Sequence, residues 1–436
     1  MIREKLSRFI NNENRTNYSQ DLDHVRAVLE LAGNPHAAFQ SIHIAGTNGK
    51  GSVAHMLNSI FMNSGYRTGL YTSPHLLEIN ERIKIQDENI PDQVFGGYVD
   101  DISASLDSTG IMPTYFDVLT ACAFRYFSEN HVDIAVIETG LGGRLDSTNV
   151  VTPCCSVITG ISLDHMDILG NTLEAIAREK AGIIKYKVPV VTANQYPMVL
   201  DIIDSASQRN RSKAFALERD FSITNIVEND DGYLFDYSLN AGPPEKIRRL
   251  KVGSPLPIQI TNSSLAVTAA LISRKLFPNL TEEKIRLGIR TAVVPGRYQI
   301  LRASPLILYD PAHNEAAMEL MIKFVREKYA RNKITLILTL MKDKNINGIL
   351  SLLEQCGLPT VYFALDDARC YRPTGSDSFK FEKIIMHDEE ALCRVLEGMK
   401  SEDSLFFFLG SFRLYRTALN YASSLPLDGG GPGVGV

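Results

Sequence analysis

Residues 40–66 read QSIHIAGTNGKGSVAHMLNSIFMNSGY, and this stretch decides the fold. A β-branched and aliphatic run leads into the glycine-rich segment 46–52, and an apolar-periodic helix is expected from Ser52 onward. Glycines let backbone N–H groups converge on an anion, the helix N-terminus adds the positive end of its dipole, and Lys50 adds a point charge toward the terminal phosphates. The stretch therefore predicts a phosphate-binding loop between a strand and a helix.

The spacing of this loop is a variant of the common GxxxxGK[ST] pattern. Ile44 stands where that pattern has its first glycine, Gly51 follows the lysine, and Ser52 comes one place later. A helix with a glycine-rich entry is the alternative, but the strand, loop and helix context favours nucleotide binding. The residues predicted to contact ATP here are Gly46, Thr47, Asn48, Gly49, Lys50, Gly51 and Ser52.

Short aliphatic runs with helical stretches between them recur on both sides of this loop. Strands that alternate with helices predict an α/β fold with a parallel sheet covered on both faces. The runs are QSIHIAG (40–46), RTGLYTS (67–73), VDIAVIETG (132–140), CSVITGIS (155–162), VPVVTA (188–193), LILYDPA (306–312), ITLILTL (334–340), VYFAL (361–365) and LFFFLGS (405–411).

The chain is expected to form two domains, because its 436 residues exceed what one hydrophobic core usually serves. The Pro-Gly pair at 295–296 predicts a boundary that separates residues 1–295 from 296–425. Polar and apolar residues alternate around NDDGYLFDYSL (229–239), which predicts a small antiparallel subdomain at about 215–255. The glycine-rich residues 426–436 are expected to be a flexible tail.

Composition excludes several classes of protein. The formal net charge of −5 argues against nucleic acid as the main partner, and no run approaches the roughly 20 apolar residues of a membrane span. The polar N-terminus lacks the apolar core of a secretory signal, so a cytoplasmic protein is expected. The six cysteines show no zinc-type CxxC pairing and are expected to be reduced thiols.

Two further positions follow predicted strands. Glu138 ends a buried run, where open α/β sheets bind ligands, and a carboxylate there suits a magnesium ion that also contacts nucleotide phosphates. His165 and Asp164 follow the run 155–162 in the same way. Read without further information, a turn residue at Glu138 and a structural histidine at His165 are the more common situations.

Several segments, in order along the chain, resemble the folylpolyglutamate synthase and dihydrofolate synthase family of the Mur ligase superfamily. The resemblance implies a P-loop ATPase domain with a parallel sheet, a smaller Rossmann-like C-terminal glutamate-ligase domain, and a monomer. The segments are IHIAGTNGKGSV (42–53), LYTSPHLLEINERIKI (70–85), PTYFDVLTACAF (113–124), IETGLGGRLDSTNVV (137–151), ISLDHMDILGNTLEAIAREKAGIIK (161–185), PGRYQ (295–299) and DPAHN (310–314), and GSFRLYR (410–416) resembles the last strand of the family.

By similarity, Ser73 and Glu138 hold one Mg²⁺ and His165 holds a second. By similarity, Lys180 matches a lysine that the family carries as a carbamate. It is chosen over Lys185 and Lys187 because of its spacing from His165. The alternative is an ordinary solvated lysine on a helix. The resemblance also implies four residues for the nucleotide and phosphates, Asn262, Arg297, Asp310 and His313, and five for the folate, Gln20, Asp21, Leu22, Thr114 and Phe116.

The chain departs from the family pattern at three places. It has DPAHN for DGAHN, Val294 and Pro295 where a tryptophan precedes PGR, and Ile258 with Gln259 where the family has an HQ pair. No departure removes a charged catalytic group. The details of adenine and linker packing are therefore the part of the resemblance that these positions affect.

The implied reaction is ATP-dependent addition of L-glutamate to a folate, in which the folate carboxylate attacks the γ-phosphoryl group and the glutamate amine then displaces phosphate. A bifunctional enzyme that also joins glutamate to dihydropteroate is an open alternative, because it would use the same residues. Another Mur-type amino-acid ligase, or a nucleotide-gated binding module without ligation, are further alternatives. Lys50, Lys180, Arg297 and His313 are the predicted catalytic residues.

Overall fold

The computed structural model describes residues 2–10, 21–107, 109–194, 196–229, 231–241, 244–374, 377 and 379–426. The chain divides into two compact units. The first unit comprises Met1–Leu163 and Leu169–Val294, and the second comprises Asp164–Ile168 and Pro295–Val436. The segment Asp164–Ile168 therefore packs with the second unit, although it lies within the first in sequence.

The first unit is built on a large sheet whose order, over the described residues, is β4-β3-β2-β5-β1-β6-β7-β8. The six strands β2, β5, β1, β6, β7 and β8 are parallel to one another. Strand β3 pairs antiparallel with β2 and with β4. The predicted parallel sheet is thus confirmed, with an antiparallel edge that the sequence did not indicate. The strands are β1 (Gln40–Ala45), β2 (Thr68–Tyr71), β3 (Ile83–Ile85), β4 (Glu88–Asn89), β5 (Ile134–Glu138), β6 (Cys155–Ile158), β7 (Val190–Thr192) and β8 (Ala214–Ala216).

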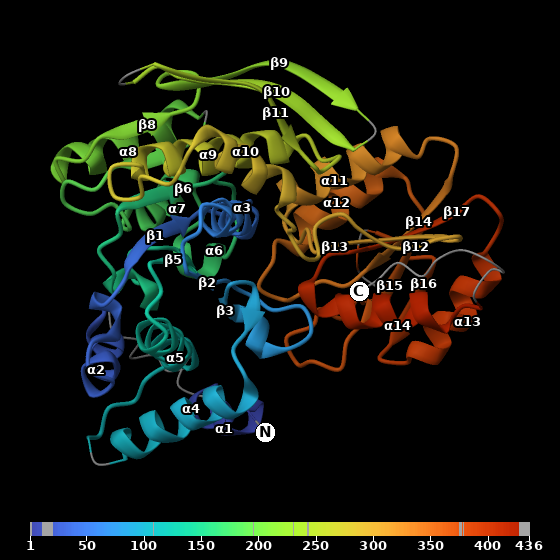
Figure 1. Ribbon diagram of the computed structural model, residues 1–436. Helices are drawn as coiled ribbons and strands as arrows, with labels where there is room; N and C mark the ends of the chain where they lie inside the picture. The colour runs from blue at the N-terminus through green and yellow to red at the C-terminus, as the bar shows by residue number, and fades with distance from the viewer. Residues whose placement is uncertain are drawn as a thin grey trace. The chain divides into compact units, whose positions relative to one another are not determined.

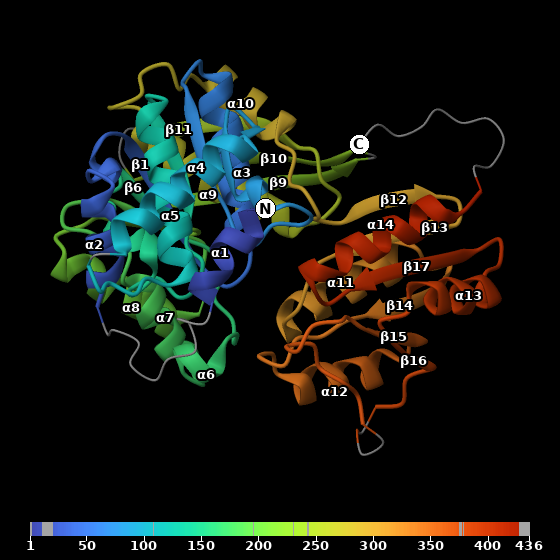
Figure 2. The ribbon, with the colours of Figure 1, turned by 90° about the horizontal axis from the view of Figure 1, so that it is seen from below.

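Helices cover both faces of this sheet (Figures 1 and 2). On one face α3 (Lys50–Asn63) packs on β1, β2 and β5, and α9 (Ile258–Ser273) packs on β6 and β7, with α10 (Glu282–Thr291) against α3. Apolar side chains on the opposite face belong to two clusters. The helices there are α1 (Ile2–Ile10), α2 (Asp23–Leu31), α4 (Asp92–Leu106), α5 (Tyr115–Glu129), α7 (Leu173–Ala181) and α8 (Pro197–Arg209).

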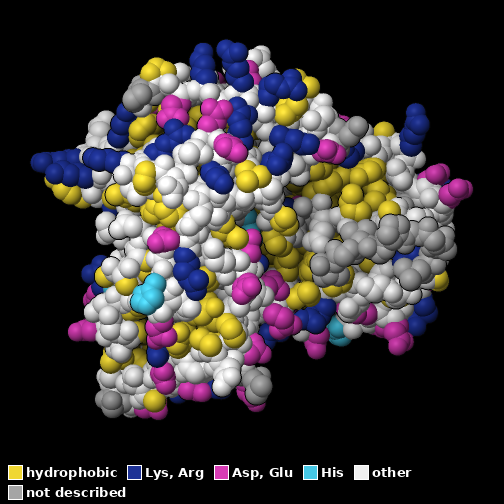
Figure 3. All heavy atoms as spheres, viewed as in Figure 1, with side chains coloured by type: hydrophobic (Ala, Val, Ile, Leu, Met, Phe, Trp, Pro, Cys, Tyr) yellow, Lys and Arg dark blue, Asp and Glu magenta, His cyan; other side chains and the backbone are white. Residues whose placement is uncertain are grey.

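A small antiparallel sheet of order β11-β10-β9 packs over α9 and α10 (Figure 1). Its strands are β9 (Phe221–Asn229), β10 (Gly232–Leu239) and β11 (Glu245–Val252). Apolar residues of β10 alternate toward the helices, and Lys246, Arg248 and Arg249 of β11 are exposed. Lys and Arg side chains gather along the upper part of the molecule in the view of Figure 3. Because α9 is enclosed by two sheets, most of its side chains are buried, including polar ones such as Gln259 and Asn262.

The second unit contains a sheet of order β12-β13-β17-β14-β15-β16 in the described residues. All neighbours are parallel except β12 and β13. Helices α11 (Glu315–Lys328) and α12 (Ile346–Cys356) lie on one face, and α13 (Glu389–Met399) and α14 (Tyr415–Ser424) on the other (Figure 1). The strands are β12 (Gln299–Ala303), β13 (Leu306–Asp310), β14 (Lys333–Leu338), β15 (Thr360–Ala364), β16 (Lys383–Met386) and β17 (Ser404–Leu409). Most of the short helix α6 (Met166–Leu169) belongs to the segment Asp164–Ile168.

Some boundaries differ from the sequence expectation. The first long helix begins at Lys50 and not at Ser52, because Gly49 already adopts the left-handed N-cap conformation. The prediction that GSFRLYR forms the last strand is wrong, since β17 ends at Leu409 and the segment turns into α14. The chain turns at Gly410, which has a positive φ of 108°, and only glycine fits this turn, since a Cβ would lie 2.3 Å from the carbonyl oxygen of Thr339. The predicted tail lies, from residue 427, outside the described residues.

Candidate functional site

The predicted phosphate loop leaves the carboxyl end of β1, between β5 and β6 of the large sheet. Two of its glycines have positive φ, Gly46 at 155° and Gly49 at 94°. A Cβ on Gly46 would lie 1.8 Å from Thr159 Oγ1, so the loop can pass the end of β6 only without a side chain. Thr47 N then donates to Gly160 O at 2.8 Å, which fixes the loop against the next strand. The loop is therefore held in place by the sheet itself.

Lys50 lies in the first turn of α3, beside the acid predicted at the end of β5. Its Nζ donates to Gly46 O at 3.1 Å and lies 3.9 Å from Glu138 Oε1. Glu138 Oε2 also accepts a hydrogen bond from the backbone N of Ser73 at 3.2 Å, and Glu138 is only 4% exposed. The structure thus brings Lys50, Glu138 and Ser73 together around the phosphate loop.

Gly49 lies so close to α9 that a Cβ built on it would be 2.6 Å from Asn262 Oδ1. We expect Gly49→Ala to lower the free energy of unfolding by about 1–3 kcal/mol, from the positive φ and the clash together, and to weaken ATP binding. Chemical denaturation and calorimetric titration with ATP would measure both. Gly33→Ala is the matched control, since Gly33 has a φ of 80° with nothing within 4 Å of its Cβ position. Equal effects of the two substitutions would contradict the proposed contact.

Helix α9 supplies a polar chain to the phosphate loop. Asn262 Nδ2 donates to Gln259 Oε1 at 3.0 Å, and Gln259 Nε2 donates to Ser52 Oγ at 3.2 Å. All three side chains are buried. Asn262 is thus placed beside the loop, within the first unit. Gln259, which the sequence marked only as part of an altered HQ pair, was missed as a neighbour of the loop, because its contact with Ser52 joins residues 207 apart.

Lys180, near the end of α7, is not a solvated helix lysine. It is 4% exposed, and its Nζ donates to Gly46 O at 2.7 Å, across 134 residues of sequence. Lys185 is half-buried and donates to Asn149 O at 2.7 Å, whereas Lys187 is exposed. Of the three lysines that the sequence offered, the one chosen is the one that contacts the phosphate loop.

The structure places His165 in the second unit, whereas Ser73 and Glu138 belong to the first. Its Nε2 lies 3.0 Å from Lys344 Nζ, and its Nδ1 lies 3.4 Å from Asp343 Oδ2. Burial and the positive charge of Lys344 lower the pKa of His165 to about 4. Over the residues that the structure describes, no group of three or more His, Cys, Asp or Glu side chains could hold a metal ion.

Asp164 is the centre of the polar contacts made by this segment. Lys344 Nζ donates to Asp164 Oδ1 at 2.9 Å, and His313 Nε2 lies 3.5 Å from Asp164 Oδ2. Burial alone would raise the pKa of Asp164, but the hydrogen bond and charge of His313 with the charges of Lys344 and His165 hold it well below the usual range. Lys344, in the segment after β14, is a residue that the sequence did not single out.

Of the three predicted nucleotide residues of the second unit, Arg297 and His313 lie against the ring of Phe412. The Arg297 guanidinium lies 5.1 Å from the ring centroid of Phe412, and the His313 ring lies 6.0 Å from it. Asp310 ends β13 and accepts hydrogen bonds from the backbone N of Tyr298 and of Ala312, each at 2.9 Å. Burial raises the pKa of Asp310, although the charge of Arg297 opposes the rise. This unit therefore presents a cation, an acid and an imidazole together.

The predicted folate residues are only partly described. Gln20 lies outside the described residues, and Asp21 is exposed and accepts from Asp23 N at 2.9 Å. Leu22 packs against the apolar cluster of α1, α2, α4 and α5. Thr114 caps α5 by accepting from Asp117 N, which gives it a structural role. Phe116 stacks on Tyr71 at 5.8 Å.

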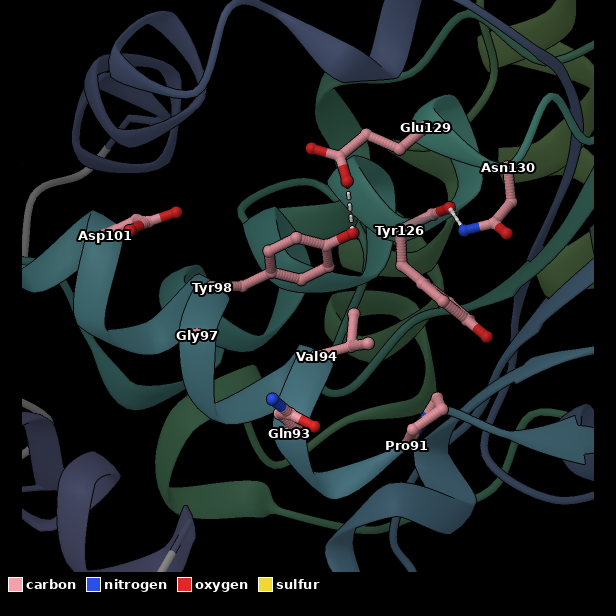
Figure 4. A pocket seen from close by; sticks show the side chains of 9 residues that line it. All are labelled: Pro91, Gln93, Val94, Gly97, Tyr98, Asp101, Tyr126, Glu129 and Asn130. Carbon is pink, nitrogen blue, oxygen red and sulfur yellow. Dashed lines mark hydrogen bonds between the residues drawn. The ribbon is translucent and has the colours of Figure 1, made fainter.

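A surface pocket of about 580 Å³ lies between α4 and α5 (Figure 4). In it Tyr98 donates to Glu129 at 2.5 Å, and Asn130 donates to the carbonyl oxygen of Tyr126 at 2.9 Å. None of the predicted site residues lines it. It is lined by Pro91, Gln93, Val94, Gly97, Tyr98, Asp101, Tyr126, Glu129 and Asn130.

His43 lies on β1, three residues before the loop, and is fully buried. Its Nε2 lies 2.8 Å from Thr148 Oγ1, and burial with the charge of Lys185 lowers its pKa to about 3. Below pH 6.5 the His43 imidazole becomes protonated in the unfolded chain but stays neutral in the folded chain. The free energy of unfolding should therefore fall by about 1.4 kcal/mol per pH unit toward pH 4. We expect His43→Gln to reduce this slope in denaturant titrations at pH 7, 6, 5 and 4. Identical slopes for variant and wild type would contradict the assignment.

Comparisons with known proteins agree on one family. Residues 44–270 match the model of the Mur ligase middle domain. The chain is 33% identical over 399 residues to the dihydrofolate synthase/folylpolyglutamate synthase of Bacillus subtilis, covering 89% of this chain and 92% of the relative. It is 36% identical over 348 residues to the folylpolyglutamate synthase of Lacticaseibacillus casei, covering 78% and 80%.

Solved structures extend the match across the chain. Mycobacterium tuberculosis folylpolyglutamate synthase complexed with ADP and AMPPCP superposes with a TM-score of 0.83 at 26% identity, over 97% of this chain and 100% of that one. E. coli FolC in complex with DHPP and ADP superposes with a TM-score of 0.83 at 27% identity, over 97% of each chain. These two proteins bind adenine nucleotides, and the second also binds DHPP.

Proposed function

The chain belongs to the folylpolyglutamate synthase and dihydrofolate synthase family of the Mur ligases, and it is an ATP-dependent ligase that adds L-glutamate to a folate. We propose that Lys50 and Glu138, at the phosphate loop, carry its phosphoryl-transfer chemistry. One observation carries this assignment. Lys50 Nζ lies 3.9 Å from the buried Glu138 carboxylate, at the carboxyl end of the central strands, where α/β sheets bind nucleotides.

The proposed reaction has two steps. A carboxylate oxygen of the acceptor attacks the γ-phosphorus of ATP, the bond to ADP breaks, and an acyl phosphate forms. The glutamate nitrogen then attacks the acyl carbon, loses a proton, and phosphate leaves. Bringing a carboxylate to a triphosphate opposes like charges, at about 4 kcal/mol per pair of unit charges 4 Å apart for an effective dielectric constant of 20. Lys50 offsets this repulsion in the first step.

The residues around Glu138 fit a magnesium ion, which we propose as the partner of ATP. A buried carboxylate with a serine hydroxyl in the adjoining loop is a set of hard oxygen donors, the type that Mg²⁺ prefers. Glu138 and Ser73 would hold this ion. His165 is kept as the residue proposed for a second ion, which would have to replace the Lys344 ammonium that lies 3.0 Å from its Nε2. When bound, Mg²⁺ neutralises phosphate charge and orients the γ-phosphoryl group. The backbone amides of residues 46–52 and Lys50 do the same from the protein side.

We further propose that Lys180 is carbamylated. In this step its neutral amine attacks carbon dioxide, an N–C bond forms, and a proton is released, which leaves an anionic oxygen pair for the metal site. Burial and the contact with the phosphate loop support this choice of lysine.

Replacing Lys180 with alanine should lower kcat by about a hundredfold or more, by the magnitude usual for a lost electrostatic group. A short carboxylate such as formate or acetate in the assay should restore part of the activity. Lys187→Ala, at an exposed lysine, is the control, and ¹³C NMR with labelled carbon dioxide would detect the carbamate. Full activity of the Lys180→Ala variant would contradict the proposal.

In the second unit, Arg297, Asp310 and His313 are proposed to contact the nucleotide, together with Asn262 of the first unit. The positions of Arg297 and His313 at Phe412 support this, because a guanidinium and an imidazole held together suit anionic phosphates. Asp21, Leu22, Thr114 and Phe116, with Gln20, are kept as the proposed folate contacts.

The proposal extends to the organisation of the chain and its setting. We propose an ATP-binding domain at 1–295, with a small antiparallel subdomain at about 215–255, a glutamate-ligase domain at 296–425, and a tail from 426. We also propose a cytoplasmic protein, and a monomer as the resemblance to the family implies. The described part of the chain has no helix long and apolar enough to cross a membrane.

The acceptor is tested by phosphate release from Mg-ATP and glutamate with tetrahydrofolate or with dihydropteroate, with products identified by mass. We expect product with tetrahydrofolate. Product with dihydropteroate as well would show a bifunctional enzyme, an alternative favoured by the B. subtilis relative and by the DHPP complex of FolC. Phosphate release that needs no amino acid, with no product, would contradict the proposed function.

A further inference from the structure

Arg82 lies beside the loop that carries Ser73, and no role in the proposed reaction has been given to it so far. It ends the short helical turn Ile79–Arg82 directly before β3. The pairing of β2 with β3 places Tyr71 opposite Ile83, and Thr72 N donates to the carbonyl oxygen of Arg82 at 3.0 Å. Arg82 is therefore fixed, by backbone contacts within the first unit, next to residues 72–74.

Arg82 is half-buried, and its guanidinium has a neutral partner. Its Nε donates to Nδ1 of His75 at 2.9 Å. Because this nitrogen accepts a hydrogen bond, the His75 ring is neutral, with its proton on Nε2. His75 thus orients the guanidinium without cancelling its charge.

The acids nearest in sequence are engaged elsewhere. Glu81 accepts backbone N–H bonds from Leu76, Leu77 and Glu78 at 2.7 to 2.9 Å, and Glu78 lies 3.9 Å from Arg3. Throughout the described ranges, no carboxylate comes within 4.0 Å of the Arg82 guanidinium. A half-buried cation without a counter-ion is costly unless an anion joins it.

We propose that Arg82, oriented by His75, is the receptor for a carboxylate of the substrates, either that of the acceptor or that of the incoming glutamate. This inference rests on the proposed function, because both substrates of that reaction carry carboxylates. A guanidinium presents parallel N–H donors that match a carboxylate in a two-point contact. The position beside residues 72–74 brings this contact to the loop whose Ser73 N–H binds Glu138.

The test is the separate measurement of KM for ATP, for tetrahydrofolate and for glutamate in Arg82→Gln, Arg82→Lys and His75→Gln. We expect Arg82→Gln to raise KM for one carboxylate substrate about 10- to 100-fold, as for a lost charged hydrogen bond, with KM for ATP within twofold. Arg82→Lys should recover part of the loss. His75→Gln, which loses the orientation but keeps the charge, should have a smaller effect than Arg82→Gln.

The substrate whose KM rises identifies the source of the carboxylate. A rise for glutamate identifies the incoming amino acid, and a rise for tetrahydrofolate identifies the acceptor. Unchanged KM for both, or a rise for ATP alone, would overturn the inference. Arg209→Gln, at an exposed arginine in the last turn of α8, is the matched control.

Two measurements separate failure of this inference from other failures. Product formation by the wild-type enzyme, identified by mass, tests the proposed function before any variant is compared. Calorimetric titration of each variant with ATP shows whether it is folded and nucleotide-competent. If Arg82→Gln does not fold, the comparison of Arg82→Lys with His75→Gln still decides, since unaltered KM values in both would overturn the inference.

Discussion

Lys50→Ala is expected to lower kcat by about a thousandfold while the protein remains folded. Lys50 stabilises charge that builds up as a carboxylate approaches the triphosphate, and one such pair corresponds to about 4 kcal/mol at 4 Å for an effective dielectric constant of 20. Because each 1.36 kcal/mol of barrier changes the rate tenfold, the loss of that pair corresponds to roughly three powers of ten. Single-turnover phosphate release would measure the effect on the chemical step.

The folded state of this variant should persist, because within the described part of the chain Lys50 Nζ contacts only loop carbonyls and one acid at the end of β5. Thermal unfolding and circular dichroism would check this. Lys275→Ala removes an exposed lysine just after α9 and is the matched control. A Lys50→Ala enzyme with near-normal kcat would show that the loop does not serve phosphoryl transfer.

Glu138→Gln is expected to lower kcat at least a hundredfold and to raise the Mg²⁺ concentration needed for half-maximal rate. The amide keeps the shape of the side chain and can still accept from Ser73 N, but it removes the negative charge that a hard cation requires. Mn²⁺ binding followed by electron paramagnetic resonance, in the presence of an ATP analogue, would report metal affinity independently of turnover.

The control for this substitution is Glu283→Gln, at an exposed acid in the first turn of α10. That variant should retain wild-type metal affinity and rate. If Glu138→Gln bound Mn²⁺ as tightly as the wild type, Glu138 would be a structural partner of Lys50 and not a metal ligand.

The part of the fold that the sequence predicted best is local. The β1, loop and α3 unit was predictable because glycine positions, strand composition and helical periodicity all lie within residues 40–66. The antiparallel β3 and β4 strands were not, because three- and two-residue strands carry too little pattern to be distinguished from turns. The last strand was extended too far because GSFRLYR was matched by resemblance, whereas the close approach of Gly410 to Thr339 at the turn is visible only in the structure.

The site shows the same limit. Lys50 could be chosen from its spacing, but the contacts of Lys180 with Gly46 and of Gln259 with Ser52 join residues 134 and 207 apart. No local pattern encodes such pairs, so Lys180 came only from resemblance and Gln259 was missed. Arg82 was within a quoted segment, yet its lack of a carboxylate partner is visible only once its neighbours are placed.

The most direct test of the central claim uses acceptor labelled with ¹⁸O in its reacting carboxylate. During glutamate-dependent turnover with Mg-ATP, the proposed acyl phosphate requires one labelled oxygen to leave with each inorganic phosphate, which mass spectrometry of the released phosphate would detect. Transfer of the label is the predicted result. Unlabelled phosphate, released at the same rate as product forms or with no product at all, would contradict the claim that this chain activates a carboxylate by phosphorylation.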